Sequence, residues 1–236
     1  MSKNSIHIGN SQDGAIIREL GNTIVCGSSG VGRTTLVKNI ITSLYTLNME
    51  DSIDVIVLSK HVSSNKSEGL ELVNTKDSNI DIDELCKLIY DEFNKRLDAT
   101  ISDNNISYLG CNKTKVFVID DDSLLKNIND KFKDIISSTT SLESVVNINF
   151  IIVTNKIDDT IYDICHKFKH IVLLYNSYEN VMKITRNKII EDISFYQKYK
   201  GLYIDGRNLV DTILFSFNDT IDRQSFDLGM LMKNIY

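Results

Sequence analysis

The sequence contains no proline and no tryptophan, and only four cysteines among its 236 residues. These cysteines, Cys26, Cys86, Cys111 and Cys165, lie far apart and include no C-x-x-C pair. Such spacing suggests neither a disulfide framework nor a zinc knuckle. We therefore expect the protein to work in a reducing compartment.

Long apolar runs are also missing, because no stretch approaches the roughly 18 residues that cross a bilayer. The first twenty residues carry Lys3, Asp13, Arg18 and Glu19 in place of the apolar core of a signal peptide. We therefore expect a protein that is neither membrane-bound nor secreted.

Basic residues are not in excess either: 26 Lys and Arg against 32 Asp and Glu give a net charge of −6. This balance argues against a surface that binds nucleic acid as a whole, and it leaves a local basic patch open.

The residues that are present suit a folded chain. Hydrophobic residues make up 42% and charged residues 25% of the sequence, which excludes wholesale disorder. The length fits one α/β domain with short ends. We predict an N-terminal extension over residues 1–21, a main domain over residues 22–217 and a C-terminal tail over residues 218–236.

Short runs rich in Val and Ile alternate with stretches of helical period, a pattern typical of a parallel sheet with crossover helices. The pattern predicts five core strands, at residues 23–26, 53–58, 115–119, 148–154 and 170–175. It predicts helices at residues 34–47, 83–97, 123–146, with a break around 137–141, and 178–199. Residues 201–205 and 209–217 are typical of a β-hairpin. The predicted fold class is α/β, with a mainly parallel five-stranded core and a C-terminal hairpin at the sheet edge.

A glycine-rich segment joins the first predicted core strand to the first predicted helix. It reads Gly27, Ser28, Ser29, Gly30, Val31, Gly32, Arg33, Thr34 and Thr35. Glycines at these spacings let backbone N–H groups point at a phosphate, and the helix N-terminus adds its positive dipole end. The segment is therefore typical of the phosphate-binding loop called Walker A.

The last three residues of this segment have separate expected roles. Thr34 is expected to coordinate magnesium through its hydroxyl, and Thr35 is expected to lie beside the α-phosphate. Arg33 stands where a lysine normally reaches the β- and γ-phosphates. A guanidinium keeps the positive charge but is planar and bulkier than an ammonium group.

Two carboxylates, Asp120 and Asp121, directly follow the predicted strand at residues 115–119. An apolar strand followed by two acidic residues has the form of a Walker B motif. We expect Asp120 to hold magnesium and Asp121 to orient or deprotonate an attacking water. The alternative is that Asp121 or Asp122 only caps the following helix. Asn155, at the end of another strand, is the candidate sensor of the γ-phosphate or of the water. Its alternative interpretation is a turn residue that ends the strand.

Asn155, Lys156, Ile157 and Asp158 also spell N-K-x-D, the motif with which GTPases read guanine. A GTPase would carry a D-x-x-G motif on the acidic strand, and Asp120 to Ser123 lacks that glycine. A further strand before N-K-x-D is missing as well. These differences favour the ASCE (RecA-like) branch of P-loop ATPases, in which an extra strand lies between the phosphate loop and the acidic strand.

With these motifs in this order, the chain resembles the genome-packaging ATPases of poxviruses and related large DNA viruses, in the FtsK/HerA superfamily. The resemblance runs from about Asn22 to about Asp205. It implies a three-layer sandwich and a motor that hydrolyses ATP with magnesium to move double-stranded DNA into a capsid. It also implies a ring-shaped homo-oligomer, capsid or portal partners, and a place in the host cytoplasm or the virion. Those relatives often have Asp-Asp in Walker B, which supports the roles of Asp120 and Asp121.

Two other functions stay open on the sequence. One is a GTPase-like switch that reads guanine through Asp158. The other is a hydrolytically weak structural subunit that binds a nucleotide, in which Arg33 has ended turnover. Arg186 is the nearest candidate for a finger that a neighbouring subunit would insert.

Overall fold

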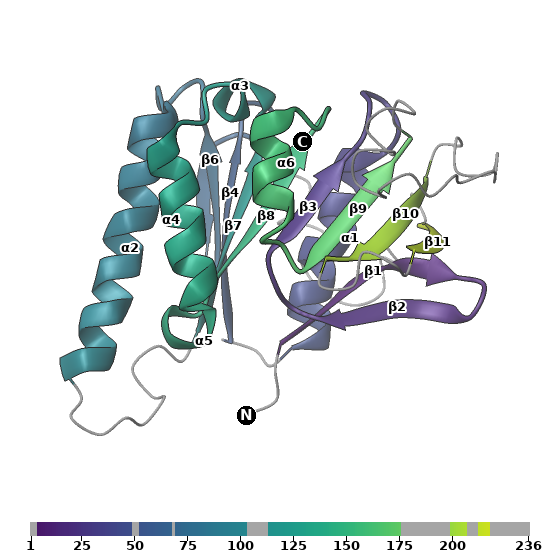
Figure 1. Cartoon of the computed structure of the whole chain (residues 1–236), viewed down its shortest axis with the longest axis horizontal. Helices are drawn as coiled ribbons and strands as arrows, with labels where there is room; N and C mark the ends of the chain where they lie inside the picture. Colours follow the sequence, from purple (N-terminus) through teal and green to yellow (C-terminus); the bar gives the residue numbers. More distant parts are fainter. Residues whose placement is uncertain are drawn as a thin grey trace. The chain divides into compact units, whose positions relative to one another are not determined.

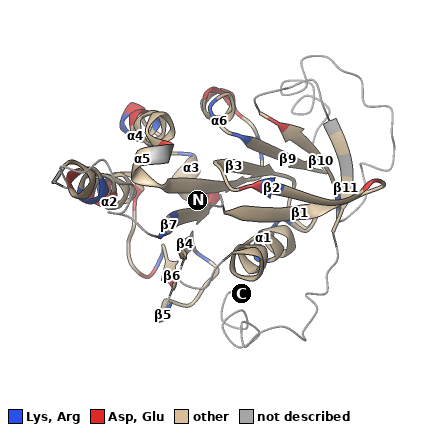
Figure 2. Ribbon diagram, turned by 90° about the horizontal axis from the view of Figure 1, so that it is seen from below, with Lys and Arg blue, Asp and Glu red and all other residues tan. Residues whose placement is uncertain are grey.

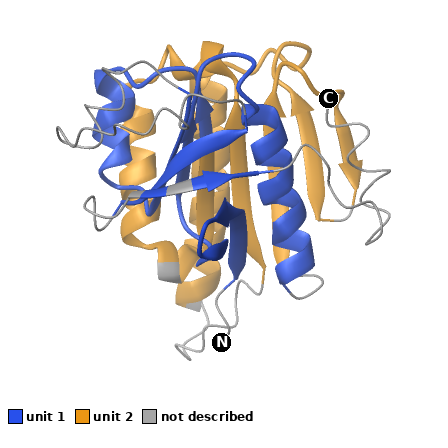
Figure 3. Ribbon diagram, turned by 90° about the vertical axis from the view of Figure 1, so that its right-hand side faces the viewer, with its two compact units in different colours: residues 1–49, 152–234 blue, residues 50–151, 235–236 orange. Residues whose placement is uncertain are grey.

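The computed structural model describes residues 4–48, 52–67, 69–102, 113–175, 199–206 and 212–217. The chain divides into two compact units (Figure 3). Unit 1 comprises residues 1–49 and 152–234, and unit 2 comprises residues 50–151 and 235–236. Strand β8 (Ile148–Thr154) crosses the boundary along the chain, so that its first part belongs to unit 2 and its end to unit 1.

Unit 1 is built on a sheet with the strand order β2-β1-β11-β10-β9-β3, followed by the end of β8. β3 and β9 are parallel, whereas β9 with β10, β10 with β11, β11 with β1 and β1 with β2 are antiparallel. The strands are β1 (Ser5–Ser11), β2 (Gly14–Glu19), β3 (Thr23–Cys26), β9 (His170–Leu174), β10 (Lys200–Asp205) and β11 (Thr212–Ser216).

Helices cover both faces of the parallel pair in unit 1. α1 (Arg33–Leu47) contacts β1 and β3, and α6 (Asp159–Cys165) lies on the opposite face (Figure 2). This arrangement explains why every residue of β3 and β9 is buried and why both strands are rich in Val and Ile. α1 buries one stripe of apolar side chains, formed by Leu36, Val37, Ile40, Ile41 and Leu44.

Unit 2 has the strand order β7-β4-β6-β5, with the first part of β8 beside β7. β4 is parallel to both β7 and β6, and the short β5 pairs antiparallel with β6. The strands are β4 (Ile53–Ser59), β5 (Asn65–Ser67), β6 (Leu70–Asn74) and β7 (Thr114–Asp120). The helices are α2 (Ile82–Ser102), α3 (Asp122–Leu125), α4 (Asp130–Ser141) and α5 (Glu143–Val146). α2 packs beside α4 and α5 (Figure 1).

The register of the parallel strands in unit 2 brings their polar ends together. Ser59 of β4 pairs with Asp120 of β7 on one side and with Asn74 of β6 on the other. Three strands therefore end at one level, which is the carboxyl edge of the sheet. This edge is where α/β proteins bind their ligands.

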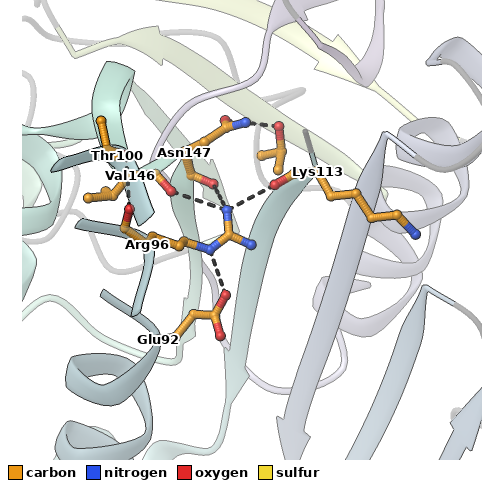
Figure 4. A network of polar contacts seen from close by, with 7 residues as sticks. Glu92, Arg96, Thr100, Lys113, Val146 and Asn147 are labelled. Atoms are coloured by element: carbon orange, nitrogen blue, oxygen red, sulfur yellow. Dashed lines mark hydrogen bonds and ion pairs between the residues drawn. The ribbon is translucent and has the colours of Figure 1, made fainter. Parts of the chain in front are cut away.

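A buried arginine occupies the opposite, amino end of β7 (Figure 4). Arg96 of α2 is only 6% exposed, and its Nε donates to Oε1 of Glu92 at 2.5 Å. Its Nη1 donates to the carbonyl oxygens of Lys113 at 2.9 Å, Val146 at 3.1 Å and Asn147 at 3.3 Å. Because Lys113 precedes β7 and Asn147 precedes β8, this one side chain fixes the start of both strands to α2.

The predicted α/β fold is confirmed, with all five predicted core strands present as β3, β4, β7, β8 and β9. The predicted hairpin is formed by β10 and β11, but its outer strand pairs onward with β1, so that β2 forms the edge instead. The helical segment after Asp121 is broken at residues 126–129 and at Leu142 rather than around residues 137–141.

The predictions for the two ends of the chain and for residues 178–199 are tested only in part. The predicted helix over 178–199 falls outside the described residues except for Tyr199, and the tail 218–236 and Arg186 lie outside them entirely. Residues 5–19, in the predicted extension, form β1 and β2. The division at residues 21 and 217 stays a prediction. Within the described ranges, the helices are too short or too polar to cross a bilayer.

Candidate functional site

The glycine-rich loop connects β3 to α1 and is held at its start by the two neighbouring strands. The backbone N–H of Gly27 donates to the carbonyl oxygen of Thr154, at the end of β8, over 3.1 Å. The N–H of Ser28 donates to the carbonyl oxygen of Tyr175, directly after β9, over 3.0 Å. The loop therefore begins from a fixed position at the carboxyl edge of unit 1.

Two glycines of the loop have a left-handed backbone. Gly30 has a φ of 81° and Gly32 has a φ of 105°, values that L side chains rarely adopt. Gly32 is the N-cap of α1, and it provides no side chain to bind the N–H groups of the first helical turn. A Cβ built on Gly30 has no atom within 4 Å, so the loop is open at this residue. N–H groups at a helix N-terminus without a side-chain cap fit the phosphates of a nucleotide.

The three residues with predicted ligand roles begin α1. Arg33, Thr34 and Thr35 form its first turn, and all three are half-buried. The stem of Arg33 lies across the start of the loop, because a Cβ built on Gly27 would meet its Cγ at 3.4 Å. The first part of the Arg33 side chain therefore packs against the start of the loop.

Asn155, the predicted sensor, lies next to the phosphate loop in unit 1. It directly follows Thr154, whose carbonyl oxygen accepts the hydrogen bond from Gly27. The hydroxyl of Thr154 turns the chain after the strand by donating to the carbonyl oxygen of Lys156 at 2.9 Å. The structure thus brings Asn155 and the loop together.

The two acidic residues have different surroundings at the carboxyl edge of unit 2. Asp120 ends β7 and is half-buried. Asp121 is only 3% exposed and is the N-cap of α3. Its Oδ1 accepts hydrogen bonds from the backbone N–H of Ser123 at 2.8 Å and from the Ser123 hydroxyl. Its Oδ2 accepts a hydrogen bond from the hydroxyl of Thr75 at 2.6 Å.

The pKa of Asp121 is lowered from its ordinary value by these partners. Burial by itself raises this pKa, because it disfavours the charged carboxylate. The hydrogen bonds from Ser123 and Thr75, together with the positive charge of Lys60, outweigh the effect of burial. Asp121 is therefore ionised at neutral pH and accepts hydrogen bonds.

Sequence reasoning missed Thr75. No motif marks this residue, which follows β6 in a segment that reads as a polar loop. The signal that could have revealed it is the apolar run Leu70, Leu72 and Val73 ahead of the polar Asn74, which forms a short strand parallel to β4. Its N–H donates to the carbonyl oxygen of Ser59 at 3.3 Å, which fixes Thr75 at the carboxyl edge.

The predicted site residues are thus found in both units. The phosphate loop, Thr34 and Asn155 belong to unit 1, and Asp120 and Asp121 belong to unit 2. Within each unit these residues lie at carboxyl ends of strands, where a P-loop protein needs them.

Asp158, which the GTPase interpretation assigns to guanine, caps a helix. Its Oδ1 accepts a hydrogen bond from the N–H of Ile161 at 3.0 Å, and this bond begins α6. Ile157, within the same motif, is 2% exposed. The motif therefore has a structural role as the N-terminus of α6.

Comparison with known proteins gives similarity in structure only. No protein-family model matches the chain, and no curated protein matches it in sequence. The pCW3 conjugation coupling protein TcpA, solved with ATPγS, is 16% identical with a TM-score of 0.67, over 98% of this chain and 70% of that one. The type VII secretion ATPase EccC of Thermomonospora curvata is 12% identical with a TM-score of 0.67, over 94% of this chain and 30% of that one.

A protein of a virus is also similar to this chain in structure. The genome packaging NTPase B204 of Sulfolobus turreted icosahedral virus 2, solved with ATPγS, is 12% identical with a TM-score of 0.56. The match covers 84% of this chain and 98% of B204. This chain therefore spans less than a third of the solved cytoplasmic domain of EccC but nearly all of B204. These matches show that the chain has the α/β fold of P-loop NTPases.

Proposed function

We propose that this chain is a magnesium-dependent P-loop ATPase of the FtsK/HerA type, and that it moves double-stranded DNA into a viral capsid. The observation that carries the proposal is the phosphate loop. Gly30 and Gly32 are left-handed, the N-terminus of α1 has no side-chain cap, and the loop is open at Gly30. Together these features leave the backbone N–H groups of the loop able to reach a phosphate.

In this proposal the loop binds the triphosphate through its backbone. The N–H groups at residues 30–35 hold the phosphate oxygens, and Arg33, in the first turn of α1, contributes its positive charge to the same oxygens. Magnesium, held by Thr34 and Asp120, would neutralise charge on the phosphates when bound.

We assign the attacking water to Asp121 and Asn155. Oδ2 of Asp121 accepts one hydrogen bond, from Thr75, and a carboxylate oxygen has two acceptor positions. The second position accepts a hydrogen bond from the water. Because the pKa of Asp121 is lowered, its main role is to orient the water, and it is a weak base. Asn155, beside the loop, binds the γ-phosphate or the same water.

The hydrogen bonds at residue 158 favour ATP over GTP. Asp158 uses its carboxylate to cap α6, which competes with reading a guanine edge. TcpA and B204 were both solved with ATPγS. Both observations support ATP as the substrate and count against the GTPase-like switch.

The fold likeness supports DNA as the cargo. TcpA is a conjugation coupling protein and B204 is a genome packaging NTPase. A chain that spans nearly the whole of B204 is large enough for the same task. We therefore propose a ring-shaped homo-oligomer that works with capsid or portal proteins.

The direct test is phosphate release from ATP and from GTP by the purified chain with magnesium, with and without double-stranded DNA. We expect ATP turnover that DNA stimulates, with Asp120→Ala as the inactive control. A preference for GTP would contradict the proposal, and so would ATP turnover that DNA leaves unchanged.

Arg33 allows a second test, of the structural-subunit alternative. Arg33→Lys restores the usual residue of the phosphate loop. If the chain is an active ATPase that uses Arg33, the variant keeps turnover within about tenfold of the natural chain, a change of about 1.4 kcal/mol in the barrier. A natural chain that binds ATP without turnover, and an Arg33→Lys variant that hydrolyses it, would show that Arg33 has ended catalysis.

A further inference from the structure

Tyr199 has an unusual backbone conformation next to the phosphate loop. Its φ is 63°, in the left-handed region. The other non-glycine residues with positive φ in the described ranges are Asn79 and Asn147, and asparagine adopts this region readily. A bulky aromatic residue does so only under strain, which the surrounding structure must hold. Strain of this kind is concentrated at ligand-binding sites, so Tyr199 needs a functional explanation.

Two backbone hydrogen bonds hold Tyr199 in place. Its N–H donates to the carbonyl oxygen of Val31, within the phosphate loop, at 3.2 Å. Its carbonyl oxygen accepts from the N–H of Phe217, directly after β11, at 3.0 Å. The strained residue therefore links the phosphate loop to the end of the hairpin.

The side chains of Tyr199 and Phe217 stand against the N-cap of α1. A Cβ built on Gly32 would lie 2.7 Å from Cδ1 of Tyr199 and 3.1 Å from Cζ of Phe217. The two rings meet edge to face, with centroids 5.6 Å apart. Phe217 is buried and Tyr199 is half-buried, so Phe217 supports the ring of Tyr199 from the inside.

The two sides of the loop differ in chemistry. On the side of β8, Gly27 is hydrogen-bonded to Thr154, and the next residue is Asn155, whose polar side chain is suited to the γ-phosphate. On the side of Val31 and Gly32 stand the two aromatic rings. A nucleotide has the same polarity, with charged phosphates at one end and a flat aromatic base at the other.

We propose that Tyr199, supported by Phe217, is the platform on which the purine base of the nucleotide stacks. This inference rests on the proposed function, because it assumes that the triphosphate binds the loop. A stacked base would give the strain at Tyr199 a function, because strained residues are concentrated at ligand-binding sites. Two constraints then require glycine at residue 32, namely its left-handed φ and the closeness of the Tyr199 ring to the position of a Cβ.

The test compares two ligands, ATP and inorganic tripolyphosphate, which has the phosphates without a base. Tyr199→Leu keeps a Cβ at the same left-handed position and removes only the ring. We expect it to weaken ATP binding by about tenfold or more and to change tripolyphosphate binding by less than about twofold. Tyr199→Phe retains the ring and should bind ATP as the natural chain does. Tyr90→Leu is the matched control, because Tyr90 lies on α2 in unit 2 and is 52% exposed.

A second variant reports stacking directly. The chain has no tryptophan, so Tyr199→Trp introduces a single fluorophore at the platform. We expect ATP to quench its emission and tripolyphosphate to leave it unchanged.

The outcomes separate this inference from the proposed function. If the natural chain binds neither ATP nor tripolyphosphate, the proposed function fails. If it binds both but Tyr199→Leu weakens the two ligands equally, Tyr199 only supports the loop and the platform is wrong. If Tyr199→Leu changes neither affinity, the platform is wrong as well.

Discussion

A buried charged group lies at each end of β7 in unit 2, and the two groups differ in their partners. At the amino end, Arg96 donates to three backbone carbonyl oxygens and to Glu92. At the carboxyl end, Asp121 accepts from two hydroxyls and one N–H. The carbonyl oxygens are fixed by the strands that follow them, whereas hydroxyls rotate. Both groups are buried among these partners, so burial of a charge does not mark a functional site by itself.

The positions of Arg96 and Asp121 along β7 distinguish a structural group from a group of the candidate site. Arg96 fixes the starts of β7 and β8 to α2, far along the strand from any predicted site residue. Asp121 follows Asp120 at the edge where β4, β6 and β7 all end. We therefore interpret the amino end as structural and the carboxyl end as the acidic part of the site.

Removing Arg96 should have the largest effect on stability. Arg96→Met removes the donor to the carbonyl oxygens of Lys113 and Val146 and to the Glu92 carboxylate, whereas the carbonyl oxygen of Asn147 keeps the N–H of Lys115. We expect the free energy of unfolding to fall by about 3–5 kcal/mol in urea titrations. Lys95→Met, which changes the exposed neighbour of Arg96 on α2, should alter it by less than about 0.5 kcal/mol. Equal values for the two variants would contradict a structural role of Arg96.

Removing Asp121 should have the next largest effect. Asp121→Ala deletes the N-cap of α3 and leaves the buried Thr75 hydroxyl without its acceptor, so we expect a loss of about 2–3 kcal/mol in the free energy of unfolding. Asp122→Ala is the control, because Asp122 lies one position further and does not cap α3. If both variants unfold at the same urea concentration, the hydrogen bonds of Asp121 do not stabilise the carboxyl edge of the sheet.

Thr75 should contribute less than Asp121 to the free energy of unfolding. When Thr75 is replaced, Asp121 keeps its hydrogen bonds to Ser123. Thr75→Val has nearly the same shape but lacks the hydroxyl, and we expect it to lower the free energy of unfolding by about 1–2 kcal/mol. Thr75→Ser keeps the hydroxyl and should recover most of this loss. A Ser variant as unstable as the Val variant would assign the effect to packing rather than to the hydrogen bond.

The pH dependence of stability gives a smaller and more specific effect. The folded pKa of Asp121 lies below its unfolded value, so the folded state binds this proton less tightly than the unfolded state. The resulting stabilisation is present above the unfolded pKa, near 3.9, and is lost as the pH falls through the folded pKa.

We therefore expect the advantage of the natural chain over Asp121→Asn to be constant above about pH 5 and to shrink at lower pH. Urea unfolding of both chains across this range measures it. An advantage that stays constant down to the acid unfolding of the chain would show that the pKa of Asp121 is not lowered.

Much of the fold was predictable because its core strands are short, apolar and covered on both faces. The phosphate loop was predictable as well, since its glycines and threonines stand at fixed spacings between a strand and a helix. β1 and β2 pair with each other across a short turn before Gly14, and the Asp13-Gly14 turn signal that marks this hairpin was overlooked. Only the pairing of β1 with β11, some 200 residues further along, has no local pattern. The cap at Asp121 was considered from the sequence, but Thr75 became visible only once β6 lay beside β4.

Arg96 was missed for a similar reason. On α2 it reads as an ordinary helix cation, four residues after Glu92. Only the packing of α2 against the starts of β7 and β8, 17 to 51 residues away, shows that it is buried. Contacts between distant segments decide which charged residue is structural, and a sequence pattern does not contain them.

The most direct test of the account compares Asp120→Asn and Asp121→Asn for both ATP turnover with magnesium and stability in urea. We predict that Asp120→Asn abolishes turnover, because Asp120 is assigned to the metal. It should lower the free energy of unfolding by less than Asp121→Asn does, because Asp120 is half-buried and Asp121 is buried. Asp121→Asn should lower both quantities. An Asp120→Asn variant that hydrolyses ATP at the rate of the natural chain would contradict the central claim.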